Sequence, residues 1–193
     1  MLKNTWKESL SVKYSEKEIE HKLWLEFKNL DSLKNDYIGD PDAIVVFAAE
    51  ETGVVGQNKQ RIEAGLRAIK SLVFQPSYIF LGTKLHNESL KEYLKGKSPF
   101  KVHYINSVDN ASTKDQILDL VKFLSENRFG NLLIISHTYH IPRVRRYSKF
   151  YLPKYIKLSF LPVGRIENQK TAVESEIKKI IEYAALGDLP LFI

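Results

Sequence analysis

The chain has 193 residues, of which 44% are hydrophobic, and this size suits one domain or one domain with an appendage. It contains no cysteine, which excludes disulfides and thiolate metal sites. The formal net charge is +6, and we find neither a secretory signal nor an apolar stretch of membrane-spanning length, so we expect a soluble, cytoplasmic protein.

The sequence of residues 1–40 predicts a separate helical segment. We assign the main domain to residues 41–193. Ser15 and Glu18 have the spacing of a capping box at a helix start. A turn-rich break follows at residues 31–41. We interpret the segment as two short helices that either complete the core of the domain or mediate self-association into a homo-oligomer.

Apolar runs alternate with helical segments five times in the rest of the chain. The apolar runs lie at 42–48, 77–81, 101–105, 132–135 and 156–161, and the helices near 57–73, 87–95, 112–127, from 142 and from 171. Asn87 and Ser112 are the expected caps of two of these helices. The alternation predicts an α/β fold of three layers, Rossmann-like, with a mostly parallel sheet of about five strands.

Polar residues recur where each predicted strand ends. They are Glu50 and Glu51 after the first strand, Thr83 after the second, Asn110 to Thr113 after the third, Ser136 to Arg143 after the fourth and Arg165 after the fifth. Because the carboxyl ends of parallel strands share one edge of a sheet, we expect these groups to converge there.

The loop after the first strand, residues 49–58, is long for a plain connection, which indicates a function. Glu50 and Glu51 would carry acid–base chemistry there, and the alternative is a solvated acidic pair on a surface loop. Arg61, in the early turns of the next helix, would face the same loop.

Residues 131–151 hold the most informative pattern in the chain. Pro142 begins a helix, and Ile141, at the expected N-cap, cannot accept a hydrogen bond. Arg143 falls in the first turn, where a cation opposes the helix dipole. Free N–H groups beside an arginine predict an anion site, with His140 as the adjacent donor. The alternative is an internal ion pair between Arg143 and a carboxylate from another loop.

Residues 137–166 carry seven lysines and arginines and no acid, so the excess positive charge of the chain is concentrated there. This distribution favours a local anion site. A nucleic-acid or anionic-surface binder shows the same feature and remains a less favoured alternative, because the interleaved aromatic residues have the helical spacing of a core.

Several of these stretches resemble the YdcF-like family, which includes SanA and ElyC, over about residues 42–161. The matches are Asp42 to Val46, Arg61-Ile-Glu-Ala, Asn110-Ala-Ser-Thr-Lys-Asp-Gln116 and, most specifically, Ile135-Ser136-His137-Thr-Tyr-His140-Ile-Pro142-Arg143. The chain differs from the family where Gly-Gly pairs are common, at Ala48-Ala49 and Gly82-Thr83, and in lacking the membrane anchor of the envelope members.

The resemblance implies a bacterial protein of Rossmann-like fold and unknown function. It also implies a nucleotide or S-adenosylmethionine as a candidate ligand. We therefore expect the ligand-binding residues to be Arg143, Ser136, His137, Arg61, Gly82, Thr83, Asn110, Ser112 and Thr113, and the catalytic ones to be His140, Glu50 and Glu51.

Three functions remain open from the sequence. The favoured one is an enzyme, a transferase or hydrolase, acting on a phosphate-bearing or nucleotide-like small molecule. A binding or sensing module would use the same site without chemistry, and a nucleic-acid binder would use residues 137–166. His137 and His140 could instead ligate a metal with Glu50 or Asp109, although we expect no metal because the irregular loop gives their spacing no geometric support.

Overall fold

The structure is a computed structural model that describes residues 14–30, 40–49, 54–72, 74–96, 100–109, 111–164 and 170–193. Its strands are β1 (Ala43–Phe47), β2 (Ser77–Gly82), β3 (Val102–Asn106), β4 (Asn131–His137) and β5 (Lys157–Val163). Its helices are α2 (Glu16–Lys28), α3 (Gly56–Lys70), α4 (Lys84–Leu94), α5 (Thr113–Glu126), α6 (Ile141–Tyr151) and α7 (Lys170–Ala185).

The five strands form one parallel sheet in the order β3-β2-β1-β4-β5. β4 lies inside the sheet, where Ile134 is in register with Val45 of β1 and Phe160 of β5. All five residues of β1 are buried, as expected for a parallel strand that is covered on both faces. The predicted three-layer, Rossmann-like α/β fold is therefore confirmed.

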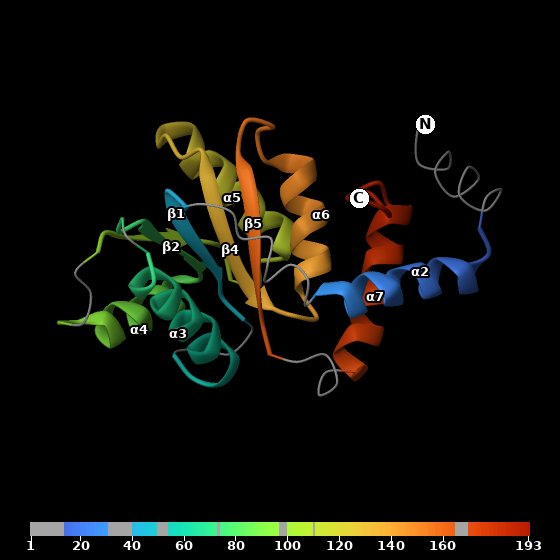
Figure 1. Cartoon of the computed structure of the whole chain (residues 1–193), viewed down its shortest axis with the longest axis horizontal. Helices are drawn as coiled ribbons and strands as arrows, with labels where there is room; N and C mark the ends of the chain where they lie inside the picture. The colour runs from blue at the N-terminus through green and yellow to red at the C-terminus, as the bar shows by residue number, and fades with distance from the viewer. Residues whose placement is uncertain are drawn as a thin grey trace.

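Helices cover both faces of this sheet (Figure 1). α3 and α4 pack on one face, where Ile62 and Leu90 join strand residues such as Ile135 in one apolar cluster. α5 and α6 pack on the other face, where Ile117 and Val144 contribute to a second cluster. Residues of β4 therefore point alternately toward α3 and toward α6, and this alternation decides where its polar end residues go.

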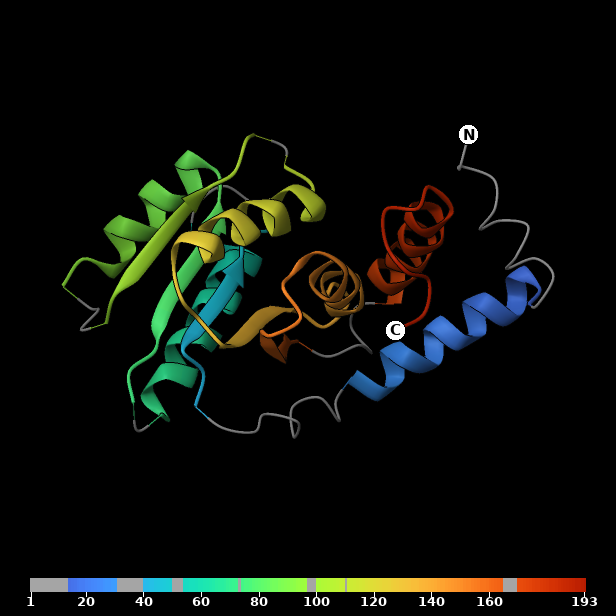
Figure 2. The ribbon, with the colours of Figure 1, turned by 90° about the horizontal axis from the view of Figure 1, so that it is seen from above.

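α7 and α2 lie beside α6, away from α3 and α4 (Figures 1 and 2). The capping box of Ser15 and Glu18 is present at the start of α2. Leu23 and Phe27 of α2 are buried in the same apolar cluster as α6 and α7. The described part of the N-terminal segment therefore helps to complete the core, whereas the other predicted helix lies outside the described residues.

Of two helix caps predicted from the sequence, one is confirmed and the other is wrong. Ser112 and Asp115 form the expected capping box at α5. The prediction for Asn87 is wrong, because α4 begins three residues earlier and is capped by Thr83. The N3 residue of that cap is His86, whose ring accepts a hydrogen bond from the Thr83 N–H at 3.2 Å. Histidine takes the place that glutamate or glutamine has in the usual capping box, so the pattern was missed.

β4 continues two residues further than the sequence predicts. Ser136 and His137 belong to the strand, and the turn before α6 is reduced to residues 138–140. The N-cap of α6 is His140 rather than Ile141, and its side chain makes no capping hydrogen bond, as expected of an uncapped start. In the part of the chain that the structure describes, no helix has both the length and the apolar character needed to cross a membrane.

Candidate functional site

β1 and β4 are neighbours in the sheet, but the chain runs from β1 toward β2 on one side and returns to β4 on the other. This is the topological switch point of the sheet. In open α/β sheets ligands bind at this point, beyond the carboxyl ends of the strands. The two strands end at Phe47 and His137, and the loops that follow them border the candidate site.

A chain of hydrogen bonds joins α3 to the ends of both strands. The Nε of Arg61 donates to Nδ1 of His137 at 2.7 Å, and its Nη1 donates to the carbonyl of Phe47 at 2.9 Å. Nε2 of His137 lies 3.0 Å from the amide oxygen of Gln60. Arg61 and His137 are buried, each with 2% of its surface exposed, whereas Gln60 is exposed.

These contacts fix the protonation of His137. A guanidinium can only donate, so Nδ1 of His137 must accept and the ring proton must sit on Nε2. Gln60 offers its amide oxygen, which is an acceptor, to that N–H. Burial and the Arg61 charge both lower the pKa of His137, to about 4, so the ring is neutral at pH 7.

The start of α3 adds further polar groups beside this chain. The amide oxygen of Asn58 accepts a hydrogen bond from the Ala49 N–H at 2.6 Å, and the Tyr139 hydroxyl donates to the amide oxygen of Gln57 at 2.7 Å. Val55, the N-cap, offers no side-chain hydrogen bond. The loop after β1 and the loop after β4 are thus tied to one helix start. The predicted catalytic residues Glu50 and Glu51 lie outside the described residues.

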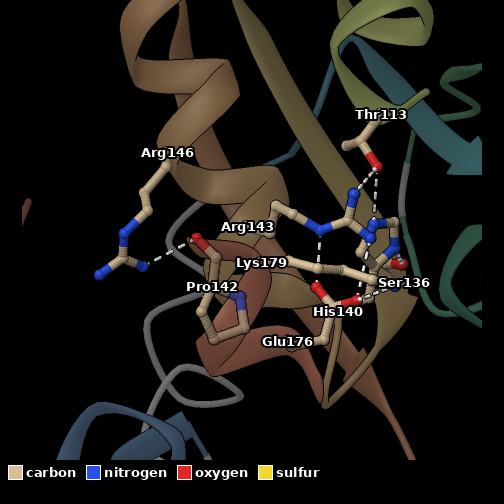
Figure 3. A network of polar contacts seen from close by, with 8 residues as sticks. All are labelled: Thr113, Ser136, His140, Pro142, Arg143, Arg146, Glu176 and Lys179. Atoms are coloured by element: carbon tan, nitrogen blue, oxygen red, sulfur yellow. Dashed lines mark hydrogen bonds and ion pairs between the residues drawn. The ribbon is translucent and has the colours of Figure 1, made fainter. Parts of the chain in front are cut away.

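On the opposite face of β4, Ser136 and His140 form a second network (Figure 3). The Ser136 hydroxyl lies 3.0 Å from Nδ1 of His140, and the Thr113 hydroxyl lies 3.0 Å from Nε2. Burial, with Arg143 next in importance, holds the pKa of His140 well below its usual value. Because both ring nitrogens face side chains of the protein, His140 links α5 to the β4–α6 turn and presents neither nitrogen to a ligand.

Arg143 forms the internal ion pair that the sequence left open as the alternative to an anion site (Figure 3). Its Nε and Nη2 donate to the two carboxylate oxygens of Glu176 at 2.6 and 3.0 Å, and its Nη1 donates to the Thr113 hydroxyl at 2.8 Å. The carboxylate comes from α7 rather than from a loop, and Glu176 is only 3% exposed. The cation that opposes the α6 dipole is therefore compensated within the chain.

The other α6 arginines are also paired, and Arg146 extends to a different side of the helix from Arg143 (Figure 3). Nη1 and Nη2 of Arg146 donate to the Glu26 carboxylate at 3.0 and 2.6 Å, and Arg145 lies 3.8 Å from it. Three of the seven cations in residues 137–166 thus attach α6 to α2 and α7. These three cations therefore serve packing between helices.

Three further predicted ligand-binding residues have a structural explanation in the part of the chain described. Thr83 and Ser112 cap α4 and α5, where their hydroxyls accept hydrogen bonds from helix N–H groups. Gly82 is closely packed, since a Cβ there would lie 2.8 Å from the Cβ of His86. Thr113 joins the His140 network, and Asn110 lies outside the described residues. The structure therefore brings together Arg61 and His137 on one face, and Ser136, Thr113, His140 and Arg143 on the other.

The metal alternative finds no support in this geometry. Both nitrogens of His137 and of His140 are engaged by protein side chains. Over the described ranges, which include Asp109 but exclude Glu50, no group of three or more metal-ligating side chains could hold an ion.

Sequence reasoning missed two features of this region. One is the set of partners Gln60 and Glu176, which no local pattern marks. The other is a groove of about 480 Å³ between α3 and the end strand β5. Ala64, Arg67, Ala68 and Ser71 line it from α3, at a spacing that places them on one side of a helix. The small residues among them, Ala64, Ala68 and Ser71, recur at helical spacing, and this spacing was the signal available in the sequence.

We compared the chain with protein-family models, curated proteins and solved structures, and found no match in any of the three. The resemblance to the YdcF-like family therefore remains a prediction from the quoted motifs.

Proposed function

We propose that the protein binds a small phosphate-bearing or nucleotide-like molecule at the switch point between β1 and β4. The observation that carries this proposal is the placement of Arg61 and His137 at the carboxyl ends of the two strands, with the imidazole N–H held as a donor. Oxygen atoms of phosphate or carboxylate groups accept such a donor.

The ligand would take the place of the Gln60 amide oxygen at the His137 N–H. Gln60 is exposed, so its side chain can turn toward solvent without disturbing the core. Arg143, the anion receptor predicted from the sequence, has no part in this proposal because Glu176 already neutralises it.

The hydroxyl–imidazole pair near the site, Ser136 and His140, is closed to a substrate, and this favours a binding role over covalent catalysis. Ser136 is fully buried and its partner His140 has both nitrogens occupied, so a substrate cannot approach the hydroxyl without rearrangement of the β4–α6 turn. His137 is suited to hold an anionic oxygen, because its Nε2–H is a donor and its one acceptor, Nδ1, is already occupied by Arg61.

Titration with inorganic phosphate, pyrophosphate, AMP and S-adenosylmethionine tests the proposal. A ligand present at 100 times its Kd stabilises the folded state by about 2.7 kcal/mol, which a thermal melt detects as a rise in Tm. We expect at least one of the four to raise Tm. In ¹⁵N–¹H spectra, the resonances of residues 57–61 and 137–139 should then shift.

Two variants locate the binding. Gln60→Ala removes the side chain that occupies the His137 N–H, and it should not weaken binding. His137→Leu removes the N–H, and it should weaken binding at least tenfold. Gln75→Ala, also at an exposed position, serves as the control. Shifts confined to α5, α6 and α7 would place the ligand elsewhere and contradict the proposal.

A further inference from the structure

The residues that the structure describes cover the α3 side of β5 incompletely. A parallel sheet normally has helices on both faces, and the chain continues from β5 into α7. α7, however, packs on the other side of the sheet, where Val173 and Ile177 join the cluster of α5 and α6. Leu161 and Val163, which point toward α3, are left only partly buried.

The groove of about 480 Å³ occupies this uncovered region, and its volume falls within the range of about 300–1,000 Å³ that is usual for small-molecule sites. Its floor is formed by Leu133, Leu161 and Val163, and its wall by the α3 side chains. From Ala64 to Ser71 the helix rises about 10 Å, at 1.5 Å per residue, so the groove is elongated.

The chemistry of the lining indicates what such a groove would hold. The floor is apolar, and Ala64 and Ala68 leave room beside it. Among the described lining residues one is charged, Arg67, whose side chain is 70% exposed and forms an ion pair with Glu63 at 4.0 Å. A pair at this distance and exposure is weak, so the guanidinium can also meet an anionic ligand. No acidic side chain is among the described residues that line the groove. An apolar body with an anionic end complements this lining, whereas a cationic molecule does not.

We propose that this groove is a binding site for a linear monocarboxylate, with the alkyl chain lying along β5 and the carboxylate paired with Arg67. The site is distinct from the switch point, because none of its lining residues belongs to the Arg61–His137–Gln60 chain. In the described part of the chain the two sites approach each other near Val163 and Gly164, whose carbonyl oxygens lie 3.0 and 2.7 Å from the Thr138 hydroxyl.

Calorimetric titration of the full chain with three probes of equal chain length tests the proposal. The probes are decanoate, 1-decanol and decyltrimethylammonium, each below its aggregation concentration. We expect saturable 1:1 binding of decanoate, weaker binding of decanol and none of the ammonium compound. Absence of saturable decanoate binding, or equal affinity for the carboxylate and the ammonium compound, would overturn the proposal.

Matched variants separate chain recognition from head-group recognition. Ala68→Leu places a larger side chain in the groove and should weaken decanoate binding at least tenfold. Ala172→Leu is the control, because Ala172 is a partly buried alanine on α7. Arg67→Gln should weaken decanoate binding about tenfold, in keeping with a lost charged hydrogen bond, and leave decanol unaffected. Lys70→Gln, a neighbouring cation that does not line the groove, should change neither.

Circular dichroism would first establish that each variant is folded. If Ala68→Leu failed to fold, Arg67→Gln would still decide the outcome, because an exposed guanidinium contributes little to the core. Unchanged decanoate affinity in Arg67→Gln would refute the assignment. Binding of phosphate or AMP should be the same in Ala68→Leu as in the parent protein, so failure of this site and failure of the switch-point site give different results.

Discussion

His137 presents a single N–H to the edge of the sheet, because Arg61 occupies its other ring nitrogen. His140 is held neutral in the same way, by burial between two hydroxyls. The free energy of unfolding should therefore depend on pH through two residues, His137 at the end of β4 and His140 in the turn that follows it.

We expect the free energy of unfolding to fall as the pH is lowered from about 6.5 to about 4. The pKa of His137 is about 4 in the folded protein and about 6.5 when the chain is unfolded. In this window the unfolded state binds more protons, so acid favours it. Above pH 6.5 the effect is absent, since the ring is neutral in both states. The pKa of His140 is also lowered and acts in the same direction.

Urea denaturation between pH 7 and pH 4.5 measures this slope. His137→Gln should reduce it, because the amide can accept from Arg61 and donate to Gln60 but does not titrate. His21→Gln alters an exposed histidine of α2 and should leave the slope unchanged. Equal slopes in all three proteins would mean that the pKa of His137 is the same in the folded and unfolded states, which contradicts the prediction.

The ion pair of Arg143 and Glu176 gives a second prediction at this scale. Glu176→Gln leaves a buried guanidinium without its countercharge, and loss of one partner of a buried pair costs about 3–5 kcal/mol. The residual exposure of Arg143 and its bond to Thr113 place the expected loss near 3 kcal/mol. Denaturation at pH 7 measures it. In a double-mutant cycle, Arg143→Met should cost less in the Glu176→Gln background than alone. Additive losses would show that the two side chains are not coupled.

At the scale of elements, what the sequence could predict was local. The capping boxes of α2 and α5 depend on residues three positions apart, and both were predicted correctly. The apolar runs predicted all five strands. The partner of Arg143 could not be predicted, because Glu176 is 33 positions away and on a helix that the fold alone brings near. The polar end of β4 was assigned to a turn, since Ser136 and His137 look like loop residues when their tertiary partners are unknown.

Ser112 caps α5, although the sequence also predicted it as a ligand-binding residue, and substitutions can distinguish the two roles. Ser112→Ala should cost about 1 kcal/mol, the usual loss for an N-cap, because the Asp115 N–H loses its acceptor. Ser112→Asp should retain most of the stability. Neither change should alter the affinity for the phosphate probes. Weaker phosphate binding at unchanged stability would return Ser112 to the ligand site.

The attachment of α2 is the second prediction about an element. Glu26→Gln removes the carboxylate shared by Arg145 and Arg146, so we expect faster amide hydrogen exchange throughout α2. Glu20→Gln, a carboxylate change on the same helix, should leave exchange unaltered. If both variants exchange alike, apolar packing of Leu23 and Phe27 holds the helix, and the ion pairs are dispensable.

At the scale of the whole molecule, α2 shares an apolar cluster with α6 and α7, so it should unfold together with the α/β body. The two tryptophans of the chain are Trp6 and Trp24. In Trp6→Phe, the remaining Trp24 reports on α2, whereas far-ultraviolet circular dichroism reports mainly on the other helices. We expect coincident urea transitions for the two signals, as in two-state unfolding. An earlier fluorescence transition would make α2 a separately melting appendage.

Arg146 has a consequence for how this protein can change over generations. All five of its N–H groups are used, by the Glu26 carboxylate and by the carbonyls of Pro142 and Leu191. A protein that lost Glu26 alone would keep the Arg146 charge in its core without a countercharge. A protein that lost Arg146 alone would leave the carbonyls of Pro142 and Leu191 without this donor. The two residues should therefore be retained together, while the acids on the outer side of α2 vary freely.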